Sequence, residues 1–245
     1  MRGFIDLHCH FVAGIDDGAR TVAEGQQMLR ALYQAGFSRV VATPHMRPGL
    51  FDNHRGDLTA AFAETSRALE GLEQTTPLPT IDLASEHYFD DVVFGRLMND
   101  EALPYPGGKA VLLEFYEIDF PPMIEHRLFD LRAKKRLLPV IAHPERYRAI
   151  WRSAETLERL VDSGVAALLD TAALTGKYGR QAMRSAEELL ERGLYHAACS
   201  DAHRPADVAE VQKGMDRIER EYGLDEVNFL FRDGPTSLLA GQLPE

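Results

Sequence analysis

The chain has little cysteine, no long hydrophobic run and no excess of basic residues. Its two cysteines, Cys9 and Cys199, cannot build a disulfide framework, which favours a reducing cytoplasm. No apolar run reaches the length of a membrane span, and Met1 leads directly into a strand-like segment, so we expect neither membrane insertion nor a signal peptide. With 27 Lys and Arg against 38 Asp and Glu, the formal net charge is −11, which opposes non-specific binding to nucleic acid or anionic lipid.

Apolar strand-like runs alternate with helical patterns along the chain, without a repeat, a low-complexity tract or a linker. Strands that alternate with helices imply parallel pairing through right-handed crossovers. At 245 residues the chain has the length of one barrel domain, and it carries no Gly-rich dinucleotide fingerprint. We therefore expect a single α/β domain over residues 1–245, with a seven-stranded β/α barrel favoured over an open sheet.

The expected elements follow from this alternation. Thr21 can cap the first helix and Gly36 can end it, and the Pro- and Gly-rich segment from Leu97 to Gly108 is predicted to be a loop. The predicted strands are Gly3–Leu7, Arg39–Thr43, Thr80–Ser85, Ala110–Phe115, Leu138–Ala142, Ala166–Asp170 and Tyr195–Ser200. The predicted helices are Val22–Ala35, Arg55–Leu72, Ile124–Arg136, Ala154–Ser163, Gln181–Arg192 and Val208–Tyr222.

Histidines and carboxylates gather where the predicted strands end. Because side chains alternate along a strand, His8 and His10 point to the same side and form a ready metal chelate. In a parallel barrel all carboxyl ends of the strands lie on one face, the face that carries active sites. Other metal-capable residues stand at the ends of later strands, and together with His8 and His10 they predict a metal centre on that face. They are His45, Glu86, Glu114, His143, Asp201 and His203.

The chemistry of these candidate ligands narrows the kind of metal centre. Histidine and carboxylate without a thiolate cluster suit Mn, Fe, Zn or Mg better than a structural zinc site. The candidates are too many for one ion, so two or three ions bridged by carboxylates are expected. Such a centre lowers the pKa of a bound water and holds phosphoryl oxygens.

Several neighbouring residues have two interpretations. Asp16 and Asp17 compete for one ligand role, and the other would shape the turn at Gly18. Asp6 is a candidate to orient an imidazole, whereas Cys9 alternates away from the histidines and is expected to pack. The roles of Glu145 and Asp170 stay open between support of the site and a surface or capping role, and ordinary roles are expected for His54, His87, His126 and His196.

Taken together, the motifs resemble the polymerase-and-histidinol-phosphatase (PHP) superfamily. Within it the chain is similar to the manganese-dependent tyrosine-protein phosphatases of bacterial capsule and exopolysaccharide operons (CpsB/CapC type). The turn at Asp16-Asp17-Gly18 and the segment His143-Pro144-Glu145-Arg146-Tyr147 are specific to that branch. The other matching motifs are His8-Cys9-His10, Thr43-Pro44-His45, Glu86, Leu113-Glu114-Phe115 and Ser200-Asp201-Ala202-His203.

The resemblance implies a distorted seven-stranded barrel of the PHP type, similar to a TIM barrel, with three metal ions, usually manganese. It also implies that Arg146 binds the substrate phosphate and that Arg204, in a segment shorter than usual for the family, fills the role of a second arginine. By the same resemblance His8, His10, Glu114 and Asp201 hold one ion, Glu114 bridges to a second ion completed by His143 and Glu86, and Asp17, His45 and His203 serve the third.

The implied activity is hydrolysis of phosphotyrosine on the tail of a bacterial tyrosine kinase that controls polysaccharide export. A metal-activated hydroxide would attack phosphorus, with Arg146 stabilising the charge on the phosphoryl oxygens. No cysteinyl intermediate is expected, because a cysteine phosphatase places Arg six residues after its nucleophile. Here Ile15 and Pro205 stand at that spacing. Arg20, Arg47 and Phe51 flank the predicted mouth and either contact a peptide or form an ordinary solvated loop.

Three alternative functions share parts of this pattern. A histidinol-phosphate phosphatase, or another small-molecule phosphoesterase of the superfamily, would use the same ligands. A nuclease or proofreading module would need a basic, aromatic-rich groove that the acidic sequence does not indicate. A non-enzymatic kinase-binding protein would need a degenerate site, whereas this one is complete. The oligomeric state is left open, with a homo-oligomer one option.

Overall fold

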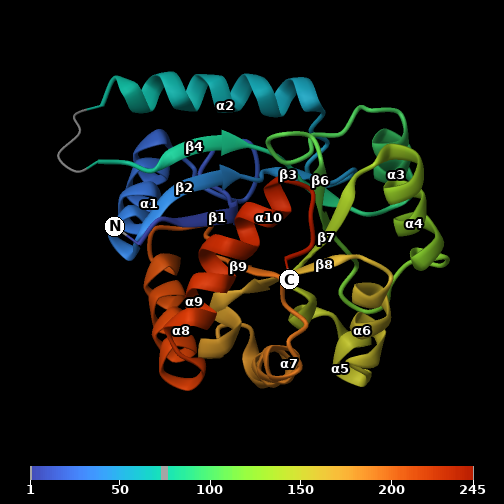
Figure 1. Ribbon diagram of the computed structural model, residues 1–245. Coiled ribbons are helices and arrows are strands. Elements are labelled where there is room, and N and C mark those ends of the chain that lie inside the picture. Colours follow the sequence, from blue (N-terminus) through green and yellow to red (C-terminus); the bar gives the residue numbers. More distant parts are fainter. Residues whose placement is uncertain (1, 73–76, 245) are drawn as a thin grey trace.

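The computed structural model describes residues 2–72 and 77–244, and within them it shows nine short strands that pair only in parallel. They form two sheets, ordered β1-β2-β4 and β3-β5-β6-β7-β8-β9 (Figure 1). The α/β class and parallel pairing expected from the sequence are confirmed. The strands are β1 (Phe4–Cys9), β2 (Phe37–Ala42), β3 (His45–Met46), β4 (Thr80–Leu83), β5 (Glu86–Tyr88), β6 (Ala110–Glu114), β7 (Leu138–Ala142), β8 (Ala166–Asp170) and β9 (Ala197–Cys199).

Two short strands, β3 and β5, lie beyond the seven expected ones. β3 follows the second expected strand, from which Pro44 separates it, because proline has no N–H to give to a ladder. The third was expected to run through Ser85 and present Glu86 at its end, but β4 stops at Leu83 and Glu86 begins β5. The break changes partners, because β4 pairs with β2 whereas β5 pairs with β3 and β6. This exchange of partners distorts the barrel and divides its sheet in two.

The last strand returns to the first and brings the two sheets together. The amide of Asp201 donates to the carbonyl of His8 at 2.9 Å, and the amide of His10 donates to the carbonyl of Ala202 at 2.9 Å. Buried side chains from successive strands fill the interior, and Tyr105 closes it by donating its hydroxyl to the carbonyl of Leu7 at 2.9 Å. Burial of this apolar surface is the main favourable contribution to folding. The members of this inner core include Leu7, Val41, Leu112, Val140, Leu168, Cys199 and Leu238.

Helices cover the outside of the strands. Helix α1 begins where Thr21 accepts a hydrogen bond from the amide of Glu24 at 3.2 Å, and it ends at Gly36, whose φ of 109° suits glycine. Helix α2 runs along β4, and α7 and α8 lie on the opposite side of the molecule (Figure 1). The helices are α1 (Val22–Ala35), α2 (Arg55–Glu70), α3 (Asp91–Met98), α4 (Ile124–Lys135), α5 (Arg148–Arg152), α6 (Glu155–Asp162), α7 (Gly179–Glu191), α8 (Asp207–Tyr222), α9 (Leu224–Asn228) and α10 (Gly234–Leu239).

Four of these helices were not expected from the sequence: α3, α5, α9 and α10. Helix α3 also extends through Met98, into the segment predicted to be a loop from Leu97 onward. All four have at most eight residues, which is too short for a clear amphipathic period. Their stability therefore comes from packing. Next to α9, for example, Phe231 lies with its ring 5.6 Å from that of Phe4 and 5.8 Å from that of Phe37.

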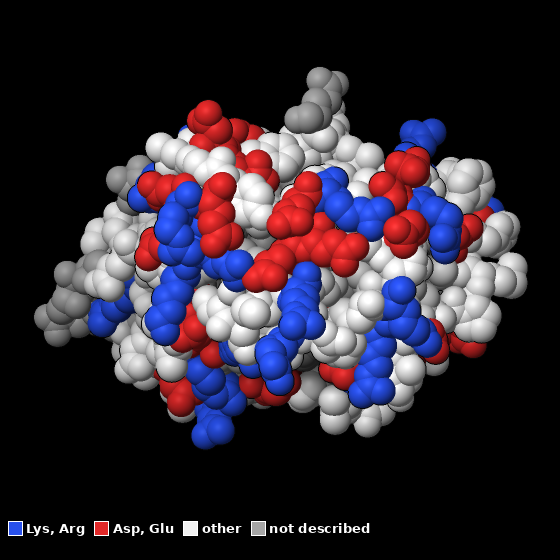
Figure 2. Space-filling model, turned by 90° about the horizontal axis from the view of Figure 1, so that it is seen from below, with Lys and Arg blue, Asp and Glu red and all other residues white. Residues whose placement is uncertain are grey.

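The surface carries both signs of charge. On the face shown in Figure 2, which includes α7 and α8, acidic and basic side chains are intermixed. At the end of α7, Arg192 lies 2.7 Å from Glu158 and 3.3 Å from Glu188, and on α8 Arg217 lies 2.6 Å from Glu187. This face therefore offers no continuous basic surface of the kind that binds nucleic acid. Among the described residues, no helix is both long enough and apolar enough to cross a membrane.

Candidate metal centre

The metal-capable side chains predicted from the sequence meet at the carboxyl ends of the strands. They form four overlapping groups, and within each group the donor atoms lie within 4.8 Å of one another. All nine residues predicted as ligands are included. The groups are His8, His10 and Asp201; His8, Glu86 and His143; His45, Glu86 and Glu114; and His10, Asp17, His45 and His203.

The innermost group combines the first and last strands. His8 Nε2 lies 3.1 Å from His10 Nε2 and 3.1 Å from Asp201 Oδ1, and His10 Nε2 lies 3.4 Å from the same oxygen. The ladder between β1 and residues 201–202 determines this geometry. Two imidazole nitrogens and one carboxylate oxygen that face one another are a donor set for a divalent cation.

Glu86 is the centre of the cluster and is almost completely buried. Its Oε2 lies 3.2 Å from His8 Nε2 and 3.1 Å from His45 Nδ1, and its Oε1 lies 3.0 Å from His143 Nε2. A carboxylate shared among three imidazoles can bridge two ions. The break between β4 and β5 puts Glu86 here, because its amide bonds the carbonyls of Thr43 and Pro44 instead of continuing β4.

The structure separates the roles of Asp16 and Asp17. Asp16 Oδ2 accepts from His10 Nδ1 at 2.8 Å and from the amide of His45 at 3.1 Å, so it orients two histidines from behind. Asp17 Oδ1 lies 3.4 Å from Nε2 of His45 and 3.4 Å from Nε2 of His203, in the outermost donor group. Gly18 completes the turn, since a Cβ there would stand 2.2 Å from the carbonyl oxygen of His10.

The ionisable side chains of the cluster lie close enough together to shift one another's pKa values. Burial and the neighbouring carboxylate of Glu86 raise the pKa of Glu114 to about 8. Burial opposes protonation of His45, but the negative charge of Glu86 and a hydrogen bond with Asp17 outweigh it and raise the pKa of His45 to about 9. Burial and the nearby guanidinium of Arg146 lower the pKa of His143 to about 4. Without a cation, some of these buried groups must gain protons.

Several buried polar atoms here have no hydrogen-bond partner among residues 2–72 and 77–244. Buried polar atoms are rarely unpaired in folded proteins, so a group of them at one place indicates a ligand. Their donors are nitrogen and oxygen, as a divalent cation of the Mn or Zn type requires, and the residues therefore fit a metal centre. The unpaired atoms that face the donor groups are His45 Nδ1, Glu114 Oε2 and Asp201 Oδ1.

Two members of the cluster have an unusual backbone. His143 has a φ of 35° and Asp201 a φ of 41°, both in the left-handed region that non-glycine residues rarely adopt. Each follows a buried strand, β7 or β9, and each turns its side chain into the donor groups. Strained backbone of this kind concentrates at functional sites, where the surrounding structure holds it in place.

The two predicted phosphate-binding arginines are at the edge of the cluster. Arg146 donates from Nη2 to Asp170 and, at 2.6 Å, to Asp201, and its guanidinium lies 3.8 Å from the ring centroid of Tyr178. Burial opposes its charge, but Asp201 outweighs that effect and raises the pKa of Arg146 above its ordinary value. Arg204 donates from Nη1 to the carbonyl of Gly18 and, at 2.8 Å, to that of His203.

The structure shows what contacts are made by the residues near the cluster that had two interpretations from the sequence. Cys9 is buried, and its thiol lies 3.7 Å from the carbonyl of Ala202, as expected for a packed residue. Asp6 accepts from the backbone amides of His8 and Ser200, so it holds the backbone instead of an imidazole. Glu145 is buried and accepts from the amide of Asp170 and the hydroxyl of Tyr195.

Asp170 has both of the roles considered for it. Its Oδ1 accepts from the amide of Ala172 at 2.9 Å and caps the following turn, while its Oδ2 accepts from Arg146. His87 is outside the donor groups, because Nδ1 donates to the carbonyl of Leu112 and Nε2 accepts from the amide of Leu103. No pattern in the sequence indicates Tyr178, which the turn at Gly176 brings to Arg146 in the folded chain.

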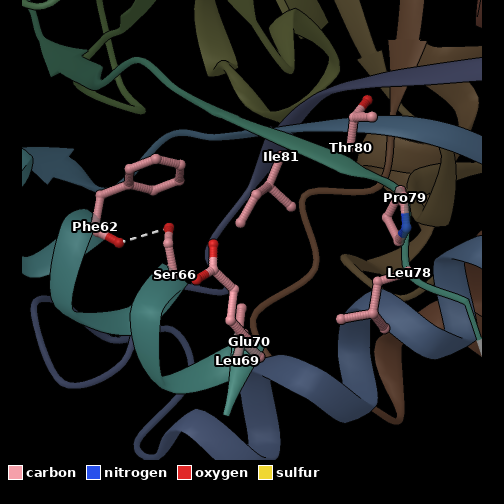
Figure 3. Close-up of a pocket in the computed structure, with 8 residues that line it drawn as sticks. All are labelled: Phe62, Ser66, Leu69, Glu70, Leu78, Pro79, Thr80 and Ile81. Atoms are coloured by element: carbon pink, nitrogen blue, oxygen red, sulfur yellow. Dashed lines mark hydrogen bonds between the residues drawn. The ribbon is translucent and has the colours of Figure 1, made fainter. Parts of the chain in front are cut away.

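A large cavity lies away from this centre. It has a volume of about 670 Å³ and lies between α2 and β4. Figure 3 shows Phe62, Ser66 and Ile81 pointing into this space from the helix and the strand. We call it the α2–β4 cavity; it is lined by Phe62, Ser66, Leu69, Glu70, Leu78, Pro79, Thr80 and Ile81.

Comparison with known proteins identifies the family. Residues 4–240 match the family described as capsular polysaccharide synthesis, CpsB/CapC. The chain belongs to the CpsB/CapC family. Among curated relatives, it is 30% identical to tyrosine-protein phosphatase YwqE of Bacillus subtilis over 97% of this chain and 92% of that protein. It is 25% identical to tyrosine-protein phosphatase CpsB of Streptococcus pneumoniae over 98% of this chain and 99% of that protein.

Solved structures agree with this membership. A crystal structure from a study of Bacillus subtilis YwqE and Streptococcus pneumoniae CpsB, described as unique metal-dependent tyrosine phosphatases, matches with a TM-score of 0.88 and 30% identity, covering 98% of this chain and 96% of that chain. The phosphotriesterase homology protein of Escherichia coli matches with a TM-score of 0.57 and 13% identity over 97% of this chain and 99% of that chain, which shows a common fold alone. The CpsB/CapC chain thus has the barrel-like fold expected from its sequence.

Proposed function

We propose that this CpsB/CapC protein is a metal-dependent tyrosine-protein phosphatase. The observation that carries the proposal is the cluster of nine histidine and carboxylate side chains at the carboxyl ends of the strands. Membership of the family supports it, because the relatives YwqE and CpsB are named tyrosine-protein phosphatases.

The nine side chains would hold two or three ions, with manganese the proposed metal. The mixed nitrogen and oxygen donors suit Mn, and Fe, Zn and Mg accept similar sets. The expected allocation joined Glu114 to His8 and His10, whereas the donor groups join it to His45 and Glu86. In the allocation proposed here, His8, Glu86 and His143 would hold one ion, His45, Glu86 and Glu114 would hold a second, and Asp17 and His203 would complete the outer site.

The protein's own residues would orient the substrate phosphate. When bound, divalent ions of this kind lower the pKa of a water and neutralise charge on phosphoryl oxygens. Arg146 is held by Asp170 and Asp201 and stacked on Tyr178, so its guanidinium is already positioned beside the donor groups. Its remaining N–H groups can donate to a phosphoryl oxygen as charge develops there. Arg204 would close the other side while it ties residues 203–204 to the turn at Gly18.

Cysteine has no proposed part in the chemistry. The thiols of Cys9 and Cys199 are buried, and burial raises the pKa of both well above the ordinary value. A buried protonated thiol is a poor nucleophile. The proposed substrate is the phosphorylated tyrosine tail of a bacterial kinase that controls polysaccharide export, and the proposed location is the cytoplasm.

The decisive experiment measures phosphate release from a phosphotyrosine peptide. Purified protein is treated with a chelator, dialysed, and assayed alone and after addition of Mn²⁺, with histidinol phosphate as the competing substrate. We expect release from the peptide only with the metal and little from histidinol phosphate. Folded, metal-loaded protein that hydrolyses histidinol phosphate and spares the peptide would replace tyrosine phosphatase with the small-molecule activity.

A further inference from the structure

A second hollow lies directly beside the metal centre. It has a volume of about 310 Å³, and both aromatic and basic side chains line it. Its walls come from segments that follow successive strands, since Arg47 follows β3, Tyr88 ends β5 and Tyr116 follows β6. Its lining includes Arg47, Tyr88, Glu114, Tyr116, Ile118 and Arg148.

Glu114 joins this hollow to the cluster. Its Oε2 lies 3.8 Å from His45 Nδ1 and 3.8 Å from Arg47 Nη1, so the same carboxylate borders the donor groups and the hollow. Any group attached to a phosphate held by the cluster can therefore reach the hollow within a short distance. The first part of a phosphotyrosine to do so is the phenyl ring, because it is bonded directly to the ester oxygen.

The walls have the chemistry that an aromatic ring prefers. The guanidinium of Arg47 lies 4.2 Å from the ring centroid of Tyr88, which gives a flat stacked wall. Tyr116 and Ile118 are 56% and 38% exposed, unusually open for an aromatic and an aliphatic side chain next to buried charge. Burying these groups against a ring removes apolar surface from water.

The charges of the hollow nearly cancel. Arg47 and Arg148 contribute two positive groups, Glu117 contributes one negative group, and Glu114 would contribute a second when a cation at the metal centre displaces its proton. Within the described part of the chain, Arg148 has no ion pair, although its backbone amide donates to the carbonyl of Glu117 at 2.7 Å. A neutral ring suits such an environment better than a second anionic group.

We propose that the hollow between Arg47, Tyr88, Tyr116 and Arg148 is an aryl pocket that binds the phenyl ring of the phosphotyrosine substrate. The proposal rests on the proposed phosphatase function and adds the residues that select aryl over alkyl phosphates. Tyr88 and Tyr116 are specificity residues in this scheme, and they do not take part in bond breaking.

The test compares two non-hydrolysable probes on the manganese-loaded protein. Titration calorimetry measures the affinities for phenylphosphonate and methylphosphonate, which share the phosphonate and differ in the ring. We expect the wild-type protein to prefer phenylphosphonate by at least about tenfold, which corresponds to about 1.4 kcal/mol. In the double variant Tyr88→Leu/Tyr116→Ala that preference should fall to about twofold or less while methylphosphonate affinity is kept.

The matched control is Tyr222→Ala, which removes a 39% exposed tyrosine at the end of α8. It should keep the wild-type preference. A double variant with the wild-type preference, or a wild-type protein that binds both probes equally, would overturn the aryl pocket.

Phosphate release from the phosphotyrosine peptide is measured on the same preparations. Release without any phenylphosphonate preference contradicts the aryl pocket and leaves the phosphatase function standing. A preference that depends on Tyr88 and Tyr116, in a protein that releases no phosphate, supports the ring-binding pocket and contradicts the phosphatase function.

Discussion

Two hollows of this molecule, the α2–β4 cavity and the aryl pocket, differ in a way that their sizes do not suggest. The α2–β4 cavity has about 670 Å³ and the aryl pocket about 310 Å³, yet of the two only the smaller one is lined by a residue of the metal centre, Glu114. The larger is lined mainly by apolar side chains from α2 and residues 78–81, and among the described residues Glu70 is the one charged side chain in its wall. Converging polar groups, and not volume, distinguish the site.

The two hollows differ in whether their buried polar atoms have hydrogen-bond partners. In the α2–β4 cavity the hydroxyl of Ser66 is satisfied, because it donates to the carbonyl of Phe62 at 2.7 Å. Beside the aryl pocket, Glu114 Oε2 is buried without a hydrogen-bond partner among the described residues. An unpaired buried carboxylate oxygen costs free energy unless a ligand meets it, whereas an apolar hollow costs only lost packing. Mutations in the two regions should therefore have different consequences.

The largest effect is expected from His143→Ala. It removes one imidazole from the buried group with His8 and Glu86, and loss of metal-derived stabilisation worth about 4 kcal/mol corresponds to about a 10³-fold fall in kcat/KM. Metal content and kcat/KM on a phosphotyrosine peptide are the measurements. The control His126→Ala removes a histidine whose side chain is 62% exposed on α4. Full activity in His143→Ala would remove this cluster as the site.

A smaller loss of activity is expected from Arg146→Lys. Lysine keeps the charge but loses the planar group that contacts Asp170, Asp201 and Tyr178 at once. We expect kcat/KM to fall about 10²-fold, the usual cost of removing one donor to a developing oxyanion, with metal content unchanged. Arg152→Lys, at a side chain 62% exposed, is the matched control. An Arg146→Lys protein with normal kcat/KM would show that this guanidinium does not bind the phosphate.

The two regions also differ in how far the sequence predicts them. His8 and His10 were predicted from alternation along a strand, and the later ligands from their positions at strand ends; the structure brings all of them together. The strand break before Glu86 was not predicted, because it depends on the bonds from its amide to the carbonyls of Thr43 and Pro44.

Loop residues were harder still to predict. The sequence indicates Arg47 as a candidate peptide contact, but it does not indicate Tyr116 or Arg148, because they meet only through tertiary contacts such as that between the amide of Arg148 and the carbonyl of Glu117. The same holds for Tyr178 beneath Arg146. Periodicity places residues on regular elements, and it contains no information on how loops from distant elements pack.

In the α2–β4 cavity we expect an effect on stability alone. Leu69 is 3% exposed, so Leu69→Ala should lower the free energy of unfolding by about 2–3 kcal/mol, in the lower part of the range for buried leucine because a cavity already borders it. Urea denaturation measures the loss, and kcat/KM at a temperature well below the melting transition should stay within about twofold of wild type. A loss of activity as large as that of Arg146→Lys would show that the two regions are coupled.

The smallest effect is a gain, from filling the same cavity. Ser66 points from α2 into the space opposite Ile81 (Figure 3), and leucine both prefers helix and can occupy that space. Ser66→Leu should therefore raise the free energy of unfolding by about 1 kcal/mol without changing activity. Ser66→Ala gains helix propensity but fills nothing, so the difference between the two variants isolates the contribution of the cavity. If Ser66→Leu were less stable than Ser66→Ala, the space would not accept a larger side chain. The α2–β4 cavity would then not be a void that can be filled, and only the unpaired polar atoms of the metal centre would distinguish the two regions.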